Sequence, residues 1–237
     1  MNQFQIDKLN ENLASVQQRV DRAALKSGRQ AGDVRLIAVT KYVDSNMTRQ
    51  LVQAGCHCLG ESRPQVLWEK GEKLQDLKVE WHLIGPLQRN KIRKSLLFAD
   101  YIHSCDSLRL LEAIDTVAAE THRQVNCLLQ VNISGEAAKQ GFQPEEVEPA
   151  ILKIREMPSV KLVGFMGMGS LAADIATHRQ EFRQLSRLLT ESQRLTSENI
   201  NLTELSIGMS GDFEVAVEEG ATLVRIGSRL YEGLSSD

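Results

Sequence analysis

The sequence predicts an α/β protein folded as a single (β/α)8 barrel of the TIM type, spanning residues 1–237, with an N-terminal helix that closes the ring. Three observations support this fold class. Eight short apolar segments alternate with helical segments at a spacing of about 25 residues. No Pro-, Gly- or Ser-rich linker divides the chain. The length of 237 residues suits one barrel domain.

The first 27 residues are predicted to be mostly helical, because apolar residues from Ile6 to Val20 recur at the spacing of one helix face. This pattern is too short for a sustained coiled coil. The strands are predicted at 34–40, 58–61, 80–85, 101–105, 125–133, 162–168, 204–209 and 223–226. The helices between them are predicted at 45–54, 65–77, 88–98, 107–120, 144–156, 174–197 and 212–219.

Strands separated by helices are expected to run parallel, because the crossover returns each strand to the same edge of the sheet. An open doubly wound sheet is the alternative. It is disfavoured because no Gly-x-Gly-x-x-Gly turn follows the first strand. No helix follows the last strand, so we expect the N-terminal helix to take that place in the ring.

The charge balance argues against nucleic acid and membrane partners. The chain has 28 Lys+Arg against 31 Asp+Glu, which leaves no basic field for polyanions. The sequence has neither a signal-like N-terminus nor an apolar run long enough to span a bilayer. Its four cysteines are too few for a disulfide scaffold. We therefore expect a cytoplasmic protein that binds a small molecule, and we expect a monomer.

Lys41, at the end of the first predicted strand, is the first candidate for chemistry. The active site of such a barrel lies at the carboxyl ends of its strands. Alternation places Lys41 on the same strand face as Ile37 and Val39. An amine among such side chains loses solvation, which lowers its pKa and makes it a nucleophile towards an aldehyde. The alternative is that Lys41 extends from the barrel mouth into water.

The loops after the seventh and eighth predicted strands suggest a phosphate site. Segment 208–212 reads GMSGD and opens into a helix, and segment 225–228 reads RIGS. Glycines let backbone N–H groups approach an anion, and the serines add hydroxyl donors. The glycines could instead serve only as turn and cap residues. A lysine next to a phosphate site points to pyridoxal 5'-phosphate, which carries both an aldehyde and a phosphate.

Several sequence blocks resemble the pyridoxal-phosphate homeostasis protein family. The blocks are AVTK at 38–41, WHLIGPLQRNK at 81–91, LQVNISGE at 129–136 with KQG at 139–141, LSIGMSGD at 205–212 and VRIG at 224–227. They occur in one order from about residue 34 to 233. The resemblance implies the barrel of the alanine racemase N-terminal domain.

By this resemblance, Lys41 holds the cofactor as an internal aldimine and Arg225 faces the pyridine nitrogen. Ser210, Gly227 and Ser228 would hold the phosphate. A cation at the ring nitrogen keeps the ring unprotonated, which weakens it as an electron sink. The chain departs from the family pattern at Ser62, where the family has an amide side chain.

Four further residues are candidates for contacts with the cofactor: Met209, His82, Ser62 and Met166. His82 could equally be a core histidine, and Met166, like Met168, could pack inside the barrel. The segment 164–170 (GFMGMGS) is rich in glycine and suggests a more mobile loop.

We predict no metal site. Cys56, His57 and Cys58 have ligand atoms, but no second cluster accompanies them, and structural packing explains them better. His122 and His178 are expected to be solvated.

The sequence thus favours a protein that binds pyridoxal 5'-phosphate, acts in cofactor and amino-acid homeostasis and has no robust turnover. A pyridoxal-phosphate-dependent amino-acid racemase is the alternative. It is disfavoured because the chain, ending at Asp237, has no length for a second domain that would complete a two-base site. A protein-binding scaffold is the third possibility.

Overall fold

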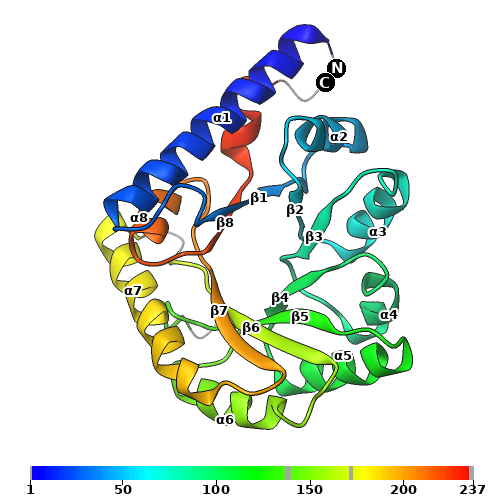
Figure 1. Ribbon diagram of the computed structural model, residues 1–237, viewed down its shortest axis with the longest axis vertical. Helices are drawn as coiled ribbons and strands as arrows, with labels where there is room; N and C mark the ends of the chain where they lie inside the picture. Colours follow the sequence, from blue (N-terminus) through cyan, green and yellow to red (C-terminus); the bar gives the residue numbers. More distant parts are fainter. Residues whose placement is uncertain (1, 137–139, 171–172, 235–237) are drawn as a thin grey trace.

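Eight parallel strands form a closed barrel in the computed structural model, which describes residues 2–136, 140–170 and 173–234 (Figure 1). The order around the ring follows the chain, and β1 pairs with β8 to close it. The strands are β1 (Arg35–Val39), β2 (Cys58–Glu61), β3 (Glu80–Leu83), β4 (Tyr101–Cys105), β5 (Val125–Gln130), β6 (Val160–Met166), β7 (Ile200–Ser206) and β8 (Leu223–Ile226). The predicted fold class is confirmed.

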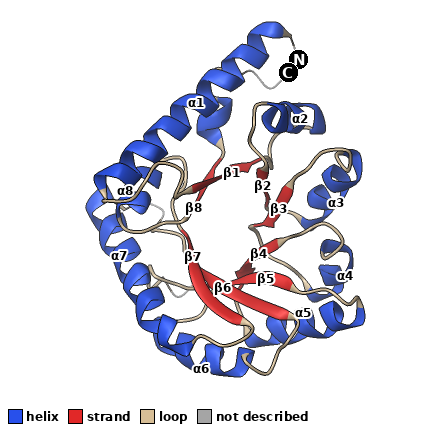
Figure 2. Ribbon diagram, viewed as in Figure 1, coloured by secondary structure: helices blue, strands red, loops and turns tan. Residues whose placement is uncertain are grey.

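Helices surround the barrel on its outer side (Figure 2). They are α1 (Gln3–Lys26), α2 (Ser45–Gln53), α3 (Pro64–Lys73), α4 (Ile92–Ser95), α5 (Leu108–Glu120), α6 (Pro144–Ile154), α7 (Ile175–Ser192) and α8 (Phe213–Glu218). Three 3₁₀ turns complete the set: η1 (Arg89–Lys91), η2 (Gln193–Leu195) and η3 (Ser228–Tyr231). The predicted helix at 88–98 is therefore only η1 followed by a single turn of α-helix.

Helix α1 closes the ring as predicted, lying beside α8 and η3 (Figure 1). Arg19 forms two hydrogen bonds of 2.8 Å with the Glu214 carboxylate of α8. The Asn12 side chain donates to the carbonyl oxygen of Leu230 in η3 at 3.1 Å. These contacts join the first helix to the last elements of the chain. Within the described residues, no helix has the length and apolar character needed to cross a membrane.

The main hydrophobic core lies between the helices and the sheet. A second, small cluster occupies the barrel interior and consists of Ile37, Leu128, Met166 and Leu223. Much of the remaining interior is polar and includes His82, His103 and Ser206, which differs from the aliphatic layers usual in such barrels. This polar interior leads up to the carboxyl ends of the strands.

Close backbone packing explains one glycine of the segment 164–170, and the expected mobility of this loop stays a prediction. A Cβ added at Gly164 would lie 1.8 Å from the backbone oxygen of Glu204, so only glycine allows β6 to approach β7 there. The described part of the loop is also held by Glu181, which accepts a hydrogen bond from the Ser170 backbone at 3.0 Å. Gly164 therefore serves the packing of β6 against β7.

Candidate functional site

A cavity of about 690 Å³ opens at the carboxyl ends of the strands. Seven of the nine predicted site residues line it: Lys41, Ser62, Met209, Ser210, Arg225, Gly227 and Ser228. They come from β8 and from the segments that follow β1, β2, β7 and β8. Strand ends far apart in the sequence meet here because the closed barrel gathers them at one edge.

Lys41 follows the end of β1 and is exposed at the cavity. The face prediction was correct, because Ile37 lies inside the barrel and Val39 lines the cavity. The expected loss of solvation was wrong. Strand β1 ends at Val39, two residues earlier, so Lys41 lies beyond the barrel interior and is exposed to solvent. Its Nζ lies 4.7 Å from the centroid of the Tyr42 ring.

A buried ion pair supports the backbone immediately before Lys41. Lys70 of α3 donates from Nζ to the Glu61 carboxylate and to the Thr40 carbonyl oxygen, each at 2.6 Å. The Thr40 hydroxyl donates to the same Glu61 oxygen at 2.5 Å. The other carboxylate oxygen of Glu61 is buried with no hydrogen-bond partner among the described residues. Sequence reasoning missed this pair, whose only signal was a charged residue ending the apolar strand 58–61.

The loops after β7 and β8 are joined to each other at Ser210. Gly227 donates its backbone N–H to the Ser210 hydroxyl oxygen at 3.2 Å. Gly208 begins the first loop with a φ of +88°, and a Cβ there would lie 2.5 Å from that of Ala216. Among the residues that the structure describes, the N–H groups of Ser210 and Gly211 meet no backbone or side-chain acceptor. These donors are available to an anion.

Arg225 lies at the base of the cavity and is buried, with 5% of its surface exposed. It donates to the Ser206 carbonyl at 2.8 Å, to the Ser206 hydroxyl at 2.6 Å and to the Gly167 carbonyl at 2.9 Å. Burial lowers the pKa of Arg225 to about 10, and the charge of Asp212 opposes this shift. The prediction that Arg225 is not a surface residue is confirmed.

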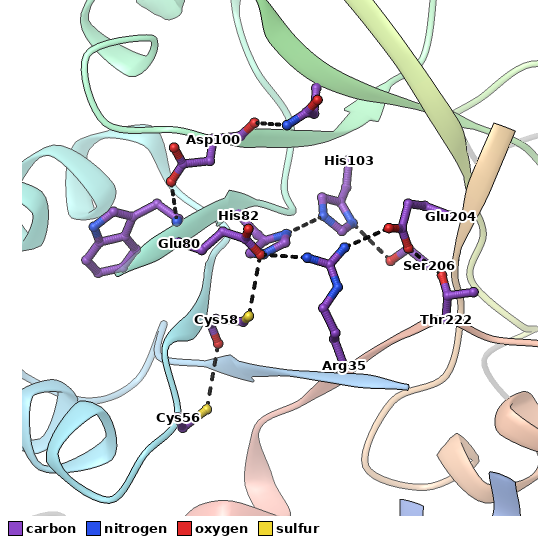
Figure 3. A network of polar contacts seen from close by, with 12 residues as sticks. Arg35, Cys56, Cys58, Glu80, His82, Asp100, His103, Glu204, Ser206 and Thr222 are labelled. Carbon is purple, nitrogen blue, oxygen red and sulfur yellow. Dashed lines mark hydrogen bonds and ion pairs between the residues drawn. The ribbon is translucent and has the colours of Figure 1, made fainter. Parts of the chain in front are cut away.

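A chain of hydrogen bonds runs through the barrel interior from Glu80 to Ser206 (Figure 3), and the Ser206 hydroxyl also accepts from Arg225. His103 contacts the Ser206 hydroxyl through Nδ1 and His82 through Nε2, both at 2.9 Å. His82 in turn contacts Glu80 at 2.9 Å. Burial lowers the pKa of both histidines, although Glu80 opposes the shift at His82. The chain positions the Arg225 guanidinium, because Ser206 is held from both sides.

His82 and Met166 are the two predicted site residues that do not line the cavity. Both side chains lie within the barrel, where His82 is fully buried and Met166 is 1% exposed. Their strand positions place them below the cavity floor, and Met168 lines the cavity instead. Gln130 was also missed. It ends the apolar strand β5, lines the cavity and donates to the Gln140 carbonyl at 3.0 Å.

The Cys56–His57–Cys58 segment does not converge on one point. Cys56 packs in the main core, whereas Cys58 packs against the interior cluster. His57 contacts the Lys78 carbonyl at 3.0 Å. His122 is exposed as expected.

His178 is not solvated. It is 14% exposed, contacts the Ser170 carbonyl through Nε2 at 2.9 Å and lies 3.4 Å from Asp212 through Nδ1. Its helix, α7, packs its side chain against the loops that border the cavity.

Residues 5–235 match the alanine racemase N-terminal domain. The fold and the cavity at its strand ends therefore define a barrel of the alanine racemase N-terminal class. The pyridoxal phosphate homeostasis protein of Aquifex aeolicus is 37% identical to this chain over 221 residues, which are 93% of this chain and 96% of that protein. The chain belongs to the pyridoxal phosphate homeostasis protein family.

Solved structures agree with this assignment. PipY of Synechococcus elongatus PCC7942, solved with pyridoxal phosphate (PLP) bound, has a TM-score of 0.82 and 33% identity, covering 94% of this chain and 99% of that one. A protein of unknown function from Bifidobacterium adolescentis has a TM-score of 0.92 and 33% identity, with 97% of each chain covered.

Proposed function

We propose that this protein binds pyridoxal 5'-phosphate in the cavity at the carboxyl ends of its strands and acts in cofactor and amino-acid homeostasis. One observation carries the proposal: an exposed amine, a buried guanidinium and two serine- and glycine-bearing loops line the same cavity. The cavity of about 690 Å³ lies within the size range of small-molecule sites. The PLP-bound structure of PipY supports the choice of ligand.

Each group of the cavity has a role in this proposal. Lys41 supplies the amine that condenses with the aldehyde carbon and releases one water, which makes the attachment covalent. Ser210 and Ser228 bind the phosphate with their hydroxyls, and Gly227 binds it with its backbone N–H, which turns from the Ser210 oxygen to the phosphate. Bound in this way, the group would supply a carbon at the aldehyde oxidation level that can exchange the Lys41 amine for another amine.

Arg225 makes this a site for binding rather than for turnover. Its buried guanidinium, facing the ring nitrogen, disfavours a proton there by like-charge repulsion. A ring without that proton withdraws electrons poorly from a substrate carbon. The hydrogen bonds that Arg225 donates to the carbonyl oxygens of Ser206 and Gly167 keep the cation in place. We further propose that the protein is a cytoplasmic monomer. Light scattering of the purified chain tests the oligomeric state.

Borohydride reduction of the cofactor-loaded protein, followed by peptide mass mapping, tests the site. The pyridoxyl label is expected on Lys41, and Lys41→Ala should remove it without loss of fold because this side chain is exposed. Lys78→Ala is the control, since Lys78 is an exposed lysine just before the amino end of β3. A pyridoxyl label on Lys91 or Lys139 of the wild-type protein would show that Lys41 is not the attachment site. If adding pyridoxal phosphate leaves the ultraviolet-visible absorption of the protein without a new band, the proposal that the protein binds this cofactor is refuted.

A further inference from the structure

Three potential metal ligands meet at the amino-terminal end of the barrel, opposite the cavity. They are Cys58 of β2 and Glu80 and His82 of β3, whose ligand atoms all lie within 4.8 Å of one another (Figure 3). Glu80 Oε1 lies 3.4 Å from Cys58 Sγ and 2.9 Å from His82 Nε2. Cys58 and Glu80 are directly paired in the sheet, which holds their side chains together.

Two of the three distances between these atoms are close to those of a tetrahedral zinc site. Zinc bonds of about 2.0–2.3 Å to nitrogen, oxygen and sulfur place neighbouring ligand atoms roughly 3.3–3.8 Å apart. The sulfur–oxygen distance of 3.4 Å already falls in that range, and the nitrogen–oxygen distance of 2.9 Å needs to widen by a few tenths of an ångström. A thiolate, an imidazole and a carboxylate together favour zinc over calcium or magnesium.

The groups around these ligands are arranged as a metal site requires. The other ring nitrogen of His82 contacts His103 at 2.9 Å, which fixes the orientation of the His82 ring. Arg35 contacts Glu80 at 2.9 Å but also contacts Glu204 at 2.8 Å. Arg35 therefore keeps Glu204 as its anionic partner when the Glu80 carboxylate binds a metal.

Charge also favours a cation at this position. Glu80 and Glu204 carry two negative charges against the single positive charge of Arg35. A divalent cation that displaces the Cys58 thiol proton to solvent brings this group to neutrality.

A second cavity borders one of these ligands, Cys58. It has a volume of about 750 Å³ and is lined by α1, by Arg35 and by the segment 54–58, which includes Cys58. From these observations, we propose that Cys58, Glu80 and His82 bind a zinc-type divalent cation, with water as the fourth ligand. The site lies at the other end of the barrel from the cofactor cavity, and His103 and Ser206 connect its ligand His82 to Arg225.

Cobalt(II) added to the chelator-treated protein is the first test, because a thiolate ligand gives a charge-transfer band in the near ultraviolet. We expect one band at a ratio of one metal per chain, reversed by zinc. Cys58→Ser should remove the band and weaken cobalt binding by about 100-fold or more. The matched control is Cys56→Ser, which should keep the band, since Cys56 packs in the main core.

Loss of the band in Cys56→Ser, its persistence in Cys58→Ser, or cobalt binding with no such band would each overturn the proposal. A measurement on the unmodified protein covers the case in which Cys58→Ser does not fold. X-ray absorption of the zinc-loaded protein should show one sulfur at about 2.3 Å and nitrogen or oxygen neighbours at about 2.0–2.1 Å. A shell of oxygen neighbours alone would contradict the site.

Discussion

Replacing Lys70 with methionine should destabilise the protein strongly, because it would leave the Glu61 carboxylate buried without its cation. The two side chains are 4% and 0% exposed. Breaking such a pair by removing one partner costs about 3–5 kcal/mol, which for a chain of this size lowers Tm by roughly 10 °C. After the change, only the Thr40 hydroxyl among the described residues still donates to Glu61 Oε1. The second carboxylate oxygen of Glu61, Oε2, already has no hydrogen-bond partner among those residues.

The double variant Lys70→Met with Glu61→Leu should recover most of this loss, since an apolar pair of similar volume leaves no buried charge. Thr40 keeps other partners in that variant. Its carbonyl still accepts from the Val43 N–H at 3.1 Å, and its hydroxyl still reaches the Gly60 carbonyl at 3.5 Å. The predicted ordering is therefore wild type, then the double variant, then Lys70→Met.

Urea unfolding followed by circular dichroism measures these differences. Lys73→Met is the matched control, because Lys73 is in the same helix but is 57% exposed and pairs with Glu69 at the surface. It should leave the unfolding midpoint nearly unchanged. The reasoning fails if Lys70→Met unfolds at the same urea concentration as Lys73→Met, or if the double variant is no more stable than Lys70→Met.

Three further predictions concern the cavity and the interior. Ser210→Ala, and more strongly Arg225→Ala, should weaken cofactor binding by about 1.5–3 kcal/mol for each hydrogen bond lost to a charged group. Equilibrium dialysis measures the affinity, and unchanged binding in both variants would show that these loops do not form the phosphate site. The cofactor-loaded protein should racemise alanine, serine, lysine and glutamate negligibly, because Arg225 disfavours the ring proton; chiral chromatography showing about one turnover per second or faster would promote a racemase function. Stability should fall as the pH drops below the ordinary histidine pKa of 6.5, since the lowered pKa values of His82 and His103 mean that the unfolded chain takes up protons that the folded protein does not. His103→Asn should reduce this slope in urea midpoints measured between pH 5 and pH 7, and an unchanged slope would mean that other groups set it.

The ring of eight strands was predictable because each strand is a short buried apolar run followed by a helix. The segments Tyr101–Cys105 and Leu223–Ile226 match their predicted bounds. The seventh strand was placed at 204–209 but spans Ile200–Ser206. Exposed polar residues at 201 and 203 hid its start, and the left-handed backbone at Gly208 takes the chain out of the sheet.

The cavity lining was predictable for a different reason. Once a closed barrel is assumed, residues at the strand ends must meet, which brings Lys41 and Arg225 into one cavity. The alternation of side chains along a strand predicts which residues face inward, but not how far below the cavity each of them lies. His82 and Met166 face inward but lie below the cavity. The pairing of Glu61 with Lys70 was also hidden, because it joins a strand to a helix through packing that no sequence period records.

The polar interior of the barrel has a consequence for how related sequences can diverge. Arg35 bridges Glu80 and Glu204, and Glu80 also contacts His82. A change at any one of these positions leaves a charge or a hydrogen-bond donor of the network without its partner. Substitutions here should therefore occur in sets, so that relatives lacking Arg35 also lack one of its two glutamates. In a large alignment, these positions should covary more strongly with one another than with the aliphatic residues on the same strands.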